Sequence, residues 1–177
     1  MWSVVTISIR ERSERIYKDL PKAIPKYTKI ELQFDSSIDA NFEKVAKGRS
    51  RIIRIYSYLR FKTADGKFTN PYPAIVDTGA YVSVIPHKIW SACDTKLIGK
   101  YRMSGLVAKE ECTVPVLVGE IVGKLVDMKN STDECRFMAY FTITDEFPLI
   151  IGFRELLENV RLYVDYRAEK VWVEETK

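Results

Sequence analysis

Short runs in which every second residue is apolar recur along the chain, and they constrain the fold more than any other feature. They are clearest at residues 51–61, 137–143 and 162–166. A spacing of two turns one face of a β-strand toward a core and the other toward water. Hydrophobic residues make up 46% of the chain, which is enough to supply such a core. The pattern predicts an all-β fold with one or two short helices.

Residues that favour turns and caps divide these runs into elements. A short helix is expected within residues 36–48, capped by Ser37 or Asp39 and ended by Gly48. Asp65 and Gly66 predict a tight hairpin turn, and residues 154–159 predict one or two helical turns. The expected strands are 5–9, 30–34, 51–61, a return strand within 68–76, 82–85, 101–107, 112–118, 120–126, 137–143, 149–151, 162–166 and 171–173.

Several classes of protein do not fit the composition. No apolar run reaches the roughly 18–20 residues that span a bilayer, so no membrane partner is expected. The first residues, MWSVVTISIRERSER, carry their charges on the wrong side for a secretory signal. We therefore expect a soluble, cytoplasmic protein.

Metal and nucleophile chemistry also find little support. The three cysteines, Cys93, Cys112 and Cys135, are widely spaced and form no CxxC pair, which argues against a disulfide framework or a zinc site. His87 is the only histidine, and no serine or cysteine with the context of a nucleophile lies near it. No metal and no cofactor are expected.

Charge is distributed unevenly around a formal net charge of +4. Residues 1–72 hold fifteen Lys and Arg against eight Asp and Glu, or +7, and residues 73–177 hold thirteen against sixteen, or −3. A basic half permits an acidic partner such as nucleic acid. The basic residues form no block, however, and no stacked-aromatic motif accompanies them, so a nucleic-acid partner is the weaker interpretation.

A carboxylate placed at the end of a buried strand is the first candidate for chemistry. Asp77 follows the apolar run Ala-Ile-Val at 74–76 and is followed by Thr78, Gly79 and Ala80. Asp-Thr-Gly alone is a common turn sequence. Here Val82 and Val84 then alternate with polar neighbours and resume a strand, and the glycine allows backbone to approach the carboxylate closely.

About seventy residues later, a second apolar run also ends in glycine. It consists of Ile150, Ile151 and Gly152, preceded by Leu149 and followed by a predicted helical turn. Together the two motifs resemble the retropepsin-like (retroviral-type) aspartic protease family, in a single-lobe cellular or prokaryotic form. The resemblance covers residues 51–177. Residues 1–50 match no motif. They are expected to form an N-terminal extension of unassigned role, either separate from the domain at 51–177 or part of it.

The resemblance implies a closed, acid-protease-like barrel with Asp77 as the catalytic residue. The chain has one Asp-Thr-Gly and is too short for two lobes, so the family's two-carboxylate site requires a homodimer acting on a polypeptide substrate. Thr78 would tie the two loops together, Gly79 would present its carbonyl to the substrate, and Ala80 is the retroviral form of the motif. The strands at 2–9 and 171–173 should each be covered, either by pairing across the dimer axis or by insertion into the chain's own sheet, and at least one of them is expected at the dimer interface.

A flap hairpin closes over the peptide in this family. The expected hairpin is built from residues 101–107 and 113–118, and its candidate residues are Gly105, Leu106, Val107, Ala108 and Lys109. Three features depart from the retroviral pattern. The flap tip is poor in glycine, Tyr81 stands where an acidic residue grips the substrate, and Arg154 is displaced by one position after Gly152. The alternative function is therefore a non-catalytic dimeric module that binds peptide or acts as a scaffold.

Overall fold

The computed structural model describes residues 27–48, 50–104 and 113–175. Within these ranges most residues lie in β-strands, and only two short α-helices and one 3-10 helix occur. The prediction of an all-β chain with one or two short α-helices is therefore confirmed. The strand expected at 5–9 lies outside the described residues.

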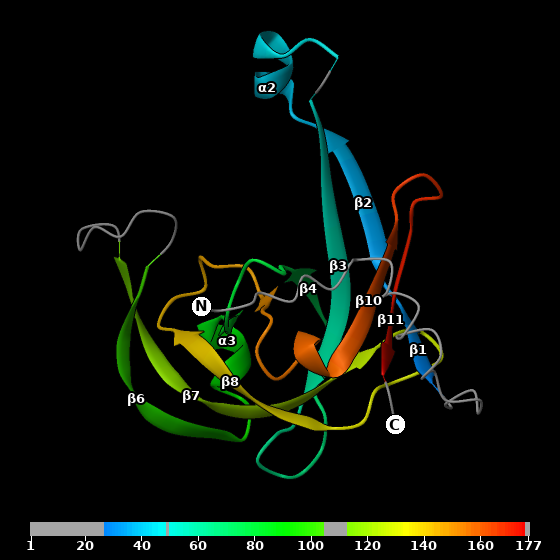
Figure 1. Cartoon of the computed structure of the whole chain (residues 1–177). Coiled ribbons are helices and arrows are strands. Elements are labelled where there is room, and N and C mark those ends of the chain that lie inside the picture. Colours follow the sequence, from blue (N-terminus) through cyan, green and yellow to red (C-terminus); the bar gives the residue numbers. More distant parts are fainter. Residues whose placement is uncertain (1–26, 49, 105–112, 176–177) are drawn as a thin grey trace, which may run out of the picture.

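The described helices and strands are shown in Figure 1. In order they are β1 (Thr28–Glu31), β2 (Gln33–Ile38), α2 (Ala40–Val45), β3 (Arg51–Phe61), β4 (Tyr72–Val76), β5 (Ser83–Ile85), α3 (His87–Trp90), β6 (Thr95–Ser104), β7 (Thr113–Val126), β8 (Cys135–Thr142), β9 (Ile150–Ile151), η2 (Leu157–Asn159), β10 (Val160–Asp165) and β11 (Lys170–Glu175).

The larger of two sheets curls back on itself. Its eight strands run in the order β2-β3-β4-β9-β5-β8-β7-β6, and β3 also pairs with β7. Six strands, from β3 through β4, β9, β5 and β8 to β7, therefore form a closed ring of neighbours. The most deeply buried large side chains of the core include Phe61, Ile121, Phe137, Phe141 and Ile151.

One long strand replaces two that the sequence pattern predicted. Two strands, 112–118 and 120–126, are expected on either side of Gly119, but β7 runs through this glycine from Thr113 to Val126. The glycine serves close packing here. A Cβ atom at this position would lie 2.6 Å from the Lys96 carbonyl oxygen and 2.7 Å from the Phe141 ring. The strand therefore continues because glycine leaves room for a neighbouring strand and an aromatic ring.

The second sheet joins both ends of the described chain. Its order is β1-β11-β10, and all of its pairs are antiparallel. Residues 28–38, within the expected N-terminal extension, pair with β11 through β1 and with β3 through β2. β11 thus has both edges hydrogen-bonded within the chain. Of the two arrangements expected for the strand at 171–173, the structure shows insertion into the chain's own sheet, and neither edge of the strand is open to a second copy.

A hairpin arm, formed by β2, α2 and the first half of β3, projects from the body (Figure 1). The helix at its tip begins after Asp39, whose Oδ1 accepts hydrogen bonds from Asn41 N at 2.8 Å and Phe42 N at 3.0 Å. Asp39 is thus the cap among the two predicted candidates, and Gly48 follows with φ of 74°. Among the described residues, no helix has the length and apolar character needed to cross a bilayer.

Candidate active site

Asp77 stands where β4 ends and the two sequence motifs meet. β4 runs parallel to β9, with Ile75 opposite Ile150 and Val76 opposite Ile151. The backbone N–H of Asp77 donates to the Ile151 carbonyl at 3.0 Å. The structure therefore brings together two motifs that lie about seventy residues apart in the sequence.

The loop after Asp77 folds back on its own carboxylate. Gly79 N donates to Asp77 Oδ1 at 2.9 Å, and Ala80 N donates to the Asp77 carbonyl at 3.2 Å. A Cβ atom at position 79 would lie 3.2 Å from Asp77 Oδ1, so glycine permits this close approach. The Asp77 side chain remains exposed to solvent and is oriented by a backbone donor.

Residues 152–154 brace this loop from the other side. Gly152 N donates to the Ser83 hydroxyl oxygen at 3.0 Å. Phe153 N donates to Ala80 O at 2.8 Å, and Arg154 N donates to Tyr81 O at 2.9 Å. A Cβ atom on Gly152 would meet backbone atoms of residue 82 at 2.4 Å. Only glycine fits against the loop at this point.

Ser83 is a site residue that the alternation pattern missed. The pattern places it on the polar face of its strand, yet it is buried and accepts the hydrogen bond from Gly152. Its two neighbours, Val82 and Val84, are buried as well. β5 lies between β8 and β9, so neither edge of this short strand is open. A small hydroxyl residue inside an otherwise apolar run is the only sequence signal for this role.

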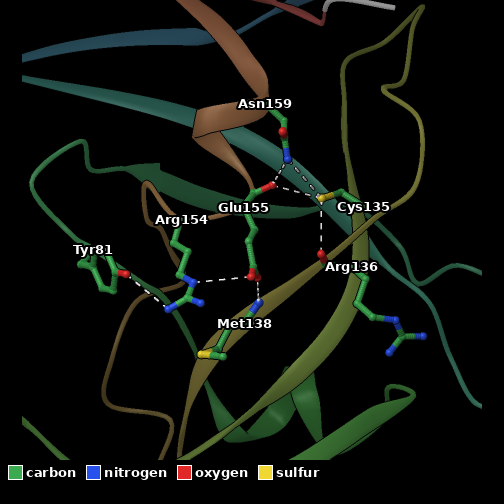
Figure 2. Close-up of polar contacts among 7 residues, drawn as sticks. All are labelled: Tyr81, Cys135, Arg136, Met138, Arg154, Glu155 and Asn159. Atoms are coloured by element: carbon green, nitrogen blue, oxygen red, sulfur yellow. Dashed lines mark hydrogen bonds and ion pairs between the residues drawn. The ribbon is translucent and has the colours of Figure 1, made fainter.

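Tyr81 and Arg154 form a pair beside the loop. Arg154 Nη1 donates to the Tyr81 hydroxyl at 3.3 Å, and the guanidinium lies 5.7 Å from the centre of the Tyr81 ring. Figure 2 shows the two side chains pointing toward each other. Arg154 is one position away from where the expected motif has its arginine, and it contacts Tyr81, which lies four positions after Asp77.

Glu155 anchors the same segment to β8 (Figure 2). Its backbone has φ of 63°, which is uncommon for a residue with a side chain. Glu155 Oε2 accepts from Met138 N at 2.6 Å, and its carbonyl accepts from Cys135 Sγ at 3.1 Å and from Asn159 Nδ2. The sequence does not predict a positive φ at this position, because glycine and asparagine, and not glutamate, are the residues that usually adopt it.

A groove of about 300 Å³ opens beside the candidate carboxylate. Asp77 and Thr78 form part of its wall. The rest is mainly apolar and comes from β3, β4, β10 and the residue that follows β10, with Ile53, Arg54, Ile55, Ile75, Val76, Leu162, Val164 and Tyr166 lining it. The apolar lining suits contact with another polypeptide surface.

The stem of the expected flap hairpin is present. β6 and β7 pair in antiparallel register from Thr95 and Ile121 to Ser104 and Thr113. The flap candidates Gly105, Leu106, Val107, Ala108 and Lys109 lie outside the described residues. Within the described part of the chain, no group of three or more His, Cys, Asp or Glu side chains is arranged to hold a metal ion.

Neither a family model nor a curated protein sequence is significantly similar to this chain.

Proposed function

We propose that this chain is one subunit of a retropepsin-like aspartic endopeptidase, with its ring of strands as the acid-protease lobe. The observation that carries the proposal is the braced loop: an exposed Asp77 carboxylate at a strand end, oriented by Gly79 N and supported by the Ile151 carbonyl. Such an arrangement preorganises a carboxylate for acid–base work.

The chemistry requires a second carboxylate. Two carboxylates held about 3 Å apart cannot both be ionised, so they share a proton and act as an acid and a base. The chain offers one Asp-Thr-Gly. A two-fold homodimer that places the two Asp77 loops face to face would supply the pair from identical parts.

Peptide hydrolysis then proceeds without a covalent enzyme intermediate. The ionised Asp77 takes a proton from a water molecule, and that water attacks the scissile carbonyl carbon. The protonated Asp77 of the second copy donates its proton to the carbonyl oxygen, giving a tetrahedral intermediate. Collapse of this intermediate breaks the C–N bond: the leaving nitrogen takes up the proton that the first Asp77 removed from water, and a hydroxyl of the intermediate returns a proton to the Asp77 of the second copy. Asp77 is restored to its initial state.

The neighbours of Asp77 take roles consistent with this scheme. The Gly79 N–H fixes one carboxylate oxygen, so the other is left to meet the partner and the water. Thr78 lines the groove next to Asp77 and is exposed, which suits contact between the two loops. By resemblance to the family, its hydroxyl would bond across the dyad and the Gly79 carbonyl would bind substrate backbone.

The decisive experiment is Asp77→Asn measured on an unfolded protein substrate at acidic and neutral pH. The amide has nearly the same size as the carboxylate, so the fold is kept while the general base is lost. Cleavage should fall by at least about 1,000-fold. Asp94→Asn, an exposed aspartate away from the loop, is the matched control. Equal cleavage by the wild type and Asp77→Asn would refute the proposal.

A wild-type chain that dimerises and binds unfolded polypeptide without cleaving it would instead identify the alternative, a non-catalytic peptide-binding or scaffold module. Binding would be measured by fluorescence anisotropy of a labelled peptide, in parallel with the cleavage assay.

A further inference from the structure

A second groove, of about 590 Å³, lies next to the groove that contains Asp77. Part of its lining comes from β3 and β4, where Tyr56 lies opposite Ile75 in antiparallel register, so both side chains are on one face of the sheet. The rest comes from Pro86 and the start of α3, and from residues 147–149, which lead into β9. We call this cavity the β4–α3 groove.

The β4–α3 groove and the Asp77 groove have two lining residues in common, Arg54 and Ile75. Ile75 is two positions before Asp77, and two residues of a strand span about 7 Å. The two cavities are therefore neighbours on the same part of the sheet. An extended polypeptide that has one peptide bond at Asp77 can continue into the β4–α3 groove.

Hydrogen bonds connect the parts of the chain that form this groove. Ile75 N donates to Leu149 O at 2.9 Å, which joins β4 to the segment before β9. Lys88 N donates to Asp145 Oδ1 at 2.7 Å, which joins α3 to the same segment. Ile89 and Leu149 line the groove and are buried. The groove is therefore formed before a ligand binds, which lowers the entropic cost of binding.

Aromatic rings and two cations line the groove. The aromatic residues are Tyr56, Tyr72 and Phe147, and the cations are Arg54 and Lys88. Arg54 and Lys88 are exposed, and among the described residues neither forms an ion pair. None of the described residues that line the groove is Asp or Glu, because residues 145 and 146, which are acidic, lie outside the lining.

This combination favours an acidic polypeptide. Aromatic rings provide apolar contact area for a substrate side chain. A guanidinium and an ammonium that have no ion-pair partner attract a carboxylate, and they repel a Lys or Arg side chain at the same place. A neutral side chain gains only the apolar contacts. The carboxylate of an Asp or Glu in the substrate therefore complements the groove best.

We propose that the β4–α3 groove binds the part of the substrate that extends beyond Asp77, and that Arg54 and Lys88 make the groove select an acidic side chain. This rests on the proposed function, which supplies a polypeptide substrate. It adds a preference for one chemical class of substrate, which the Asp-Thr-Gly motif does not indicate. Arg54 and Lys88 are then specificity-determining residues, and Asp77 carries the chemistry.

The test is peptide binding to the full-length Asp77→Asn variant, measured by fluorescence anisotropy so that cleavage is not needed. The labelled peptides have about ten residues, which span about 33 Å when extended. Each has a central Phe and one Glu at a scanned position, and a matched set has Gln at that position. At one or more positions, the Glu peptide should bind about fivefold more tightly than its Gln counterpart.

Further substitutions in the Asp77→Asn background test whether this preference comes from the groove. Lys88→Gln and Arg54→Gln should each reduce the preference for Glu to about twofold. The double variant Arg54→Glu/Lys88→Glu should reverse it, so that a peptide with Lys at the same position binds more tightly. Lys44→Gln removes the same charge from the exposed surface of α2 and should leave the preference unchanged. Thermal unfolding of each variant monitors the fold.

The outcomes separate acidic selection from the catalytic proposal. A preference for Glu that is reduced in Lys88→Gln and Arg54→Gln, but not in Lys44→Gln, supports acidic selection even if the wild type cleaves no peptide. Equal binding of the Glu and Gln sets overturns it, even if the wild type cleaves protein substrates. A preference for Glu that persists unchanged in Lys88→Gln and Arg54→Gln also overturns it, because the carboxylate then binds elsewhere.

Discussion

Two glycines show how differently one residue type acts in this protein. Gly152 is buried, and a side chain there would collide with the backbone of residues 82 and 83, where the loop after Asp77 leads into β5. Gly99 lies on exposed β6 and has open space around it. Substitutions at these two positions therefore separate the effect of a steric clash with backbone from the general effect of replacing a glycine.

Replacing Gly152 with alanine should destabilise the fold and disturb the candidate site. The added Cβ would lie 2.4 Å from the Val82 carbonyl carbon, so backbone must shift. We expect a loss of about 3 kcal/mol in the free energy of unfolding, measured by urea titration, together with reduced activity. Gly99→Ala is the control and should change stability by less than about 0.5 kcal/mol. Equal effects of the two substitutions would contradict the packing argument.

The thiol of Cys93 should be slow to react. Burial raises the pKa of Cys93 to about 11, and its Sγ contacts the Ile89 carbonyl at 3.1 Å. Because the thiolate is the reactive form, a higher pKa leaves less of it at pH 8. Alkylation by iodoacetamide, followed by peptide mass spectrometry, should be about 100-fold slower at Cys93 in the folded chain than in the urea-unfolded chain. The rate should rise as the pH approaches 11. Similar rates in both states would refute this.

How much of the site can be predicted from sequence depends on the kind of signal. Asp77 and Gly152 were predictable because each ends an apolar run, and the structure brings their segments together. Ser83 and Glu155 were not. The burial of Ser83 depends on Gly152 far away in the sequence, and the positive φ of Glu155 depends on contacts with Met138 and Cys135. Alternation reports on local environment, and these roles are set by distant partners.

At the level of elements, alternation was a good guide where one face of a strand meets solvent. It predicted β3, β8, β10 and β11, and the Asp65–Gly66 turn before β4 has the expected positive φ at Gly66, 80°. It failed at β7, where Gly119 marks close packing and not a turn. Sequence alone does not distinguish these two uses of glycine, because the neighbour that requires the space, Phe141, lies on another strand.

One carboxylate ties the first strand to the turn after β7. Asp127 Oδ2 accepts from Glu31 N at 2.9 Å, and its Oδ1 accepts from Lys129 N at 2.7 Å and Asn130 N at 2.6 Å. Burial raises the pKa of Asp127, but these backbone donors together outweigh it and hold the pKa below its usual value. The ionised form is therefore the one that stabilises the fold.

Asp127→Ala should lower the free energy of unfolding by about 1 kcal/mol at pH 7. A carboxyl whose pKa is lowered on folding stabilises the protein above its unfolded pKa of about 3.9, and that contribution disappears as the pH falls through the lower folded value. The difference in the free energy of unfolding between the wild type and Asp127→Ala should therefore become smaller below pH 4. Urea unfolding at several pH values measures it, with Asp94→Ala as the charge-matched control. A difference that is independent of pH would contradict this role.

Considered as a whole, the molecule uses its C-terminal strand to hold the two sheets together. β11 lies between β1 and β10, and Val171 and Val173 are almost completely buried. β1 continues into β2, which joins the larger sheet through β3. A strand in this position stabilises the fold of the single chain.

Deletion of residues 170–177 should therefore prevent folding, and not merely separate a dimer. The deletion removes two buried valines and the pairing partner of both β1 and β10, so the smaller sheet cannot form. Near-ultraviolet circular dichroism and urea unfolding should show loss of the cooperative transition. Trp172→Ala removes a half-buried ring that stacks on Tyr163 at a distance of 5.1 Å between ring centres. This variant should remain folded. Loss of the stacking should lower its free energy of unfolding by about 1 kcal/mol, in addition to the effect of the apolar surface that is no longer buried. A truncated chain that still unfolds cooperatively would contradict this role of β11.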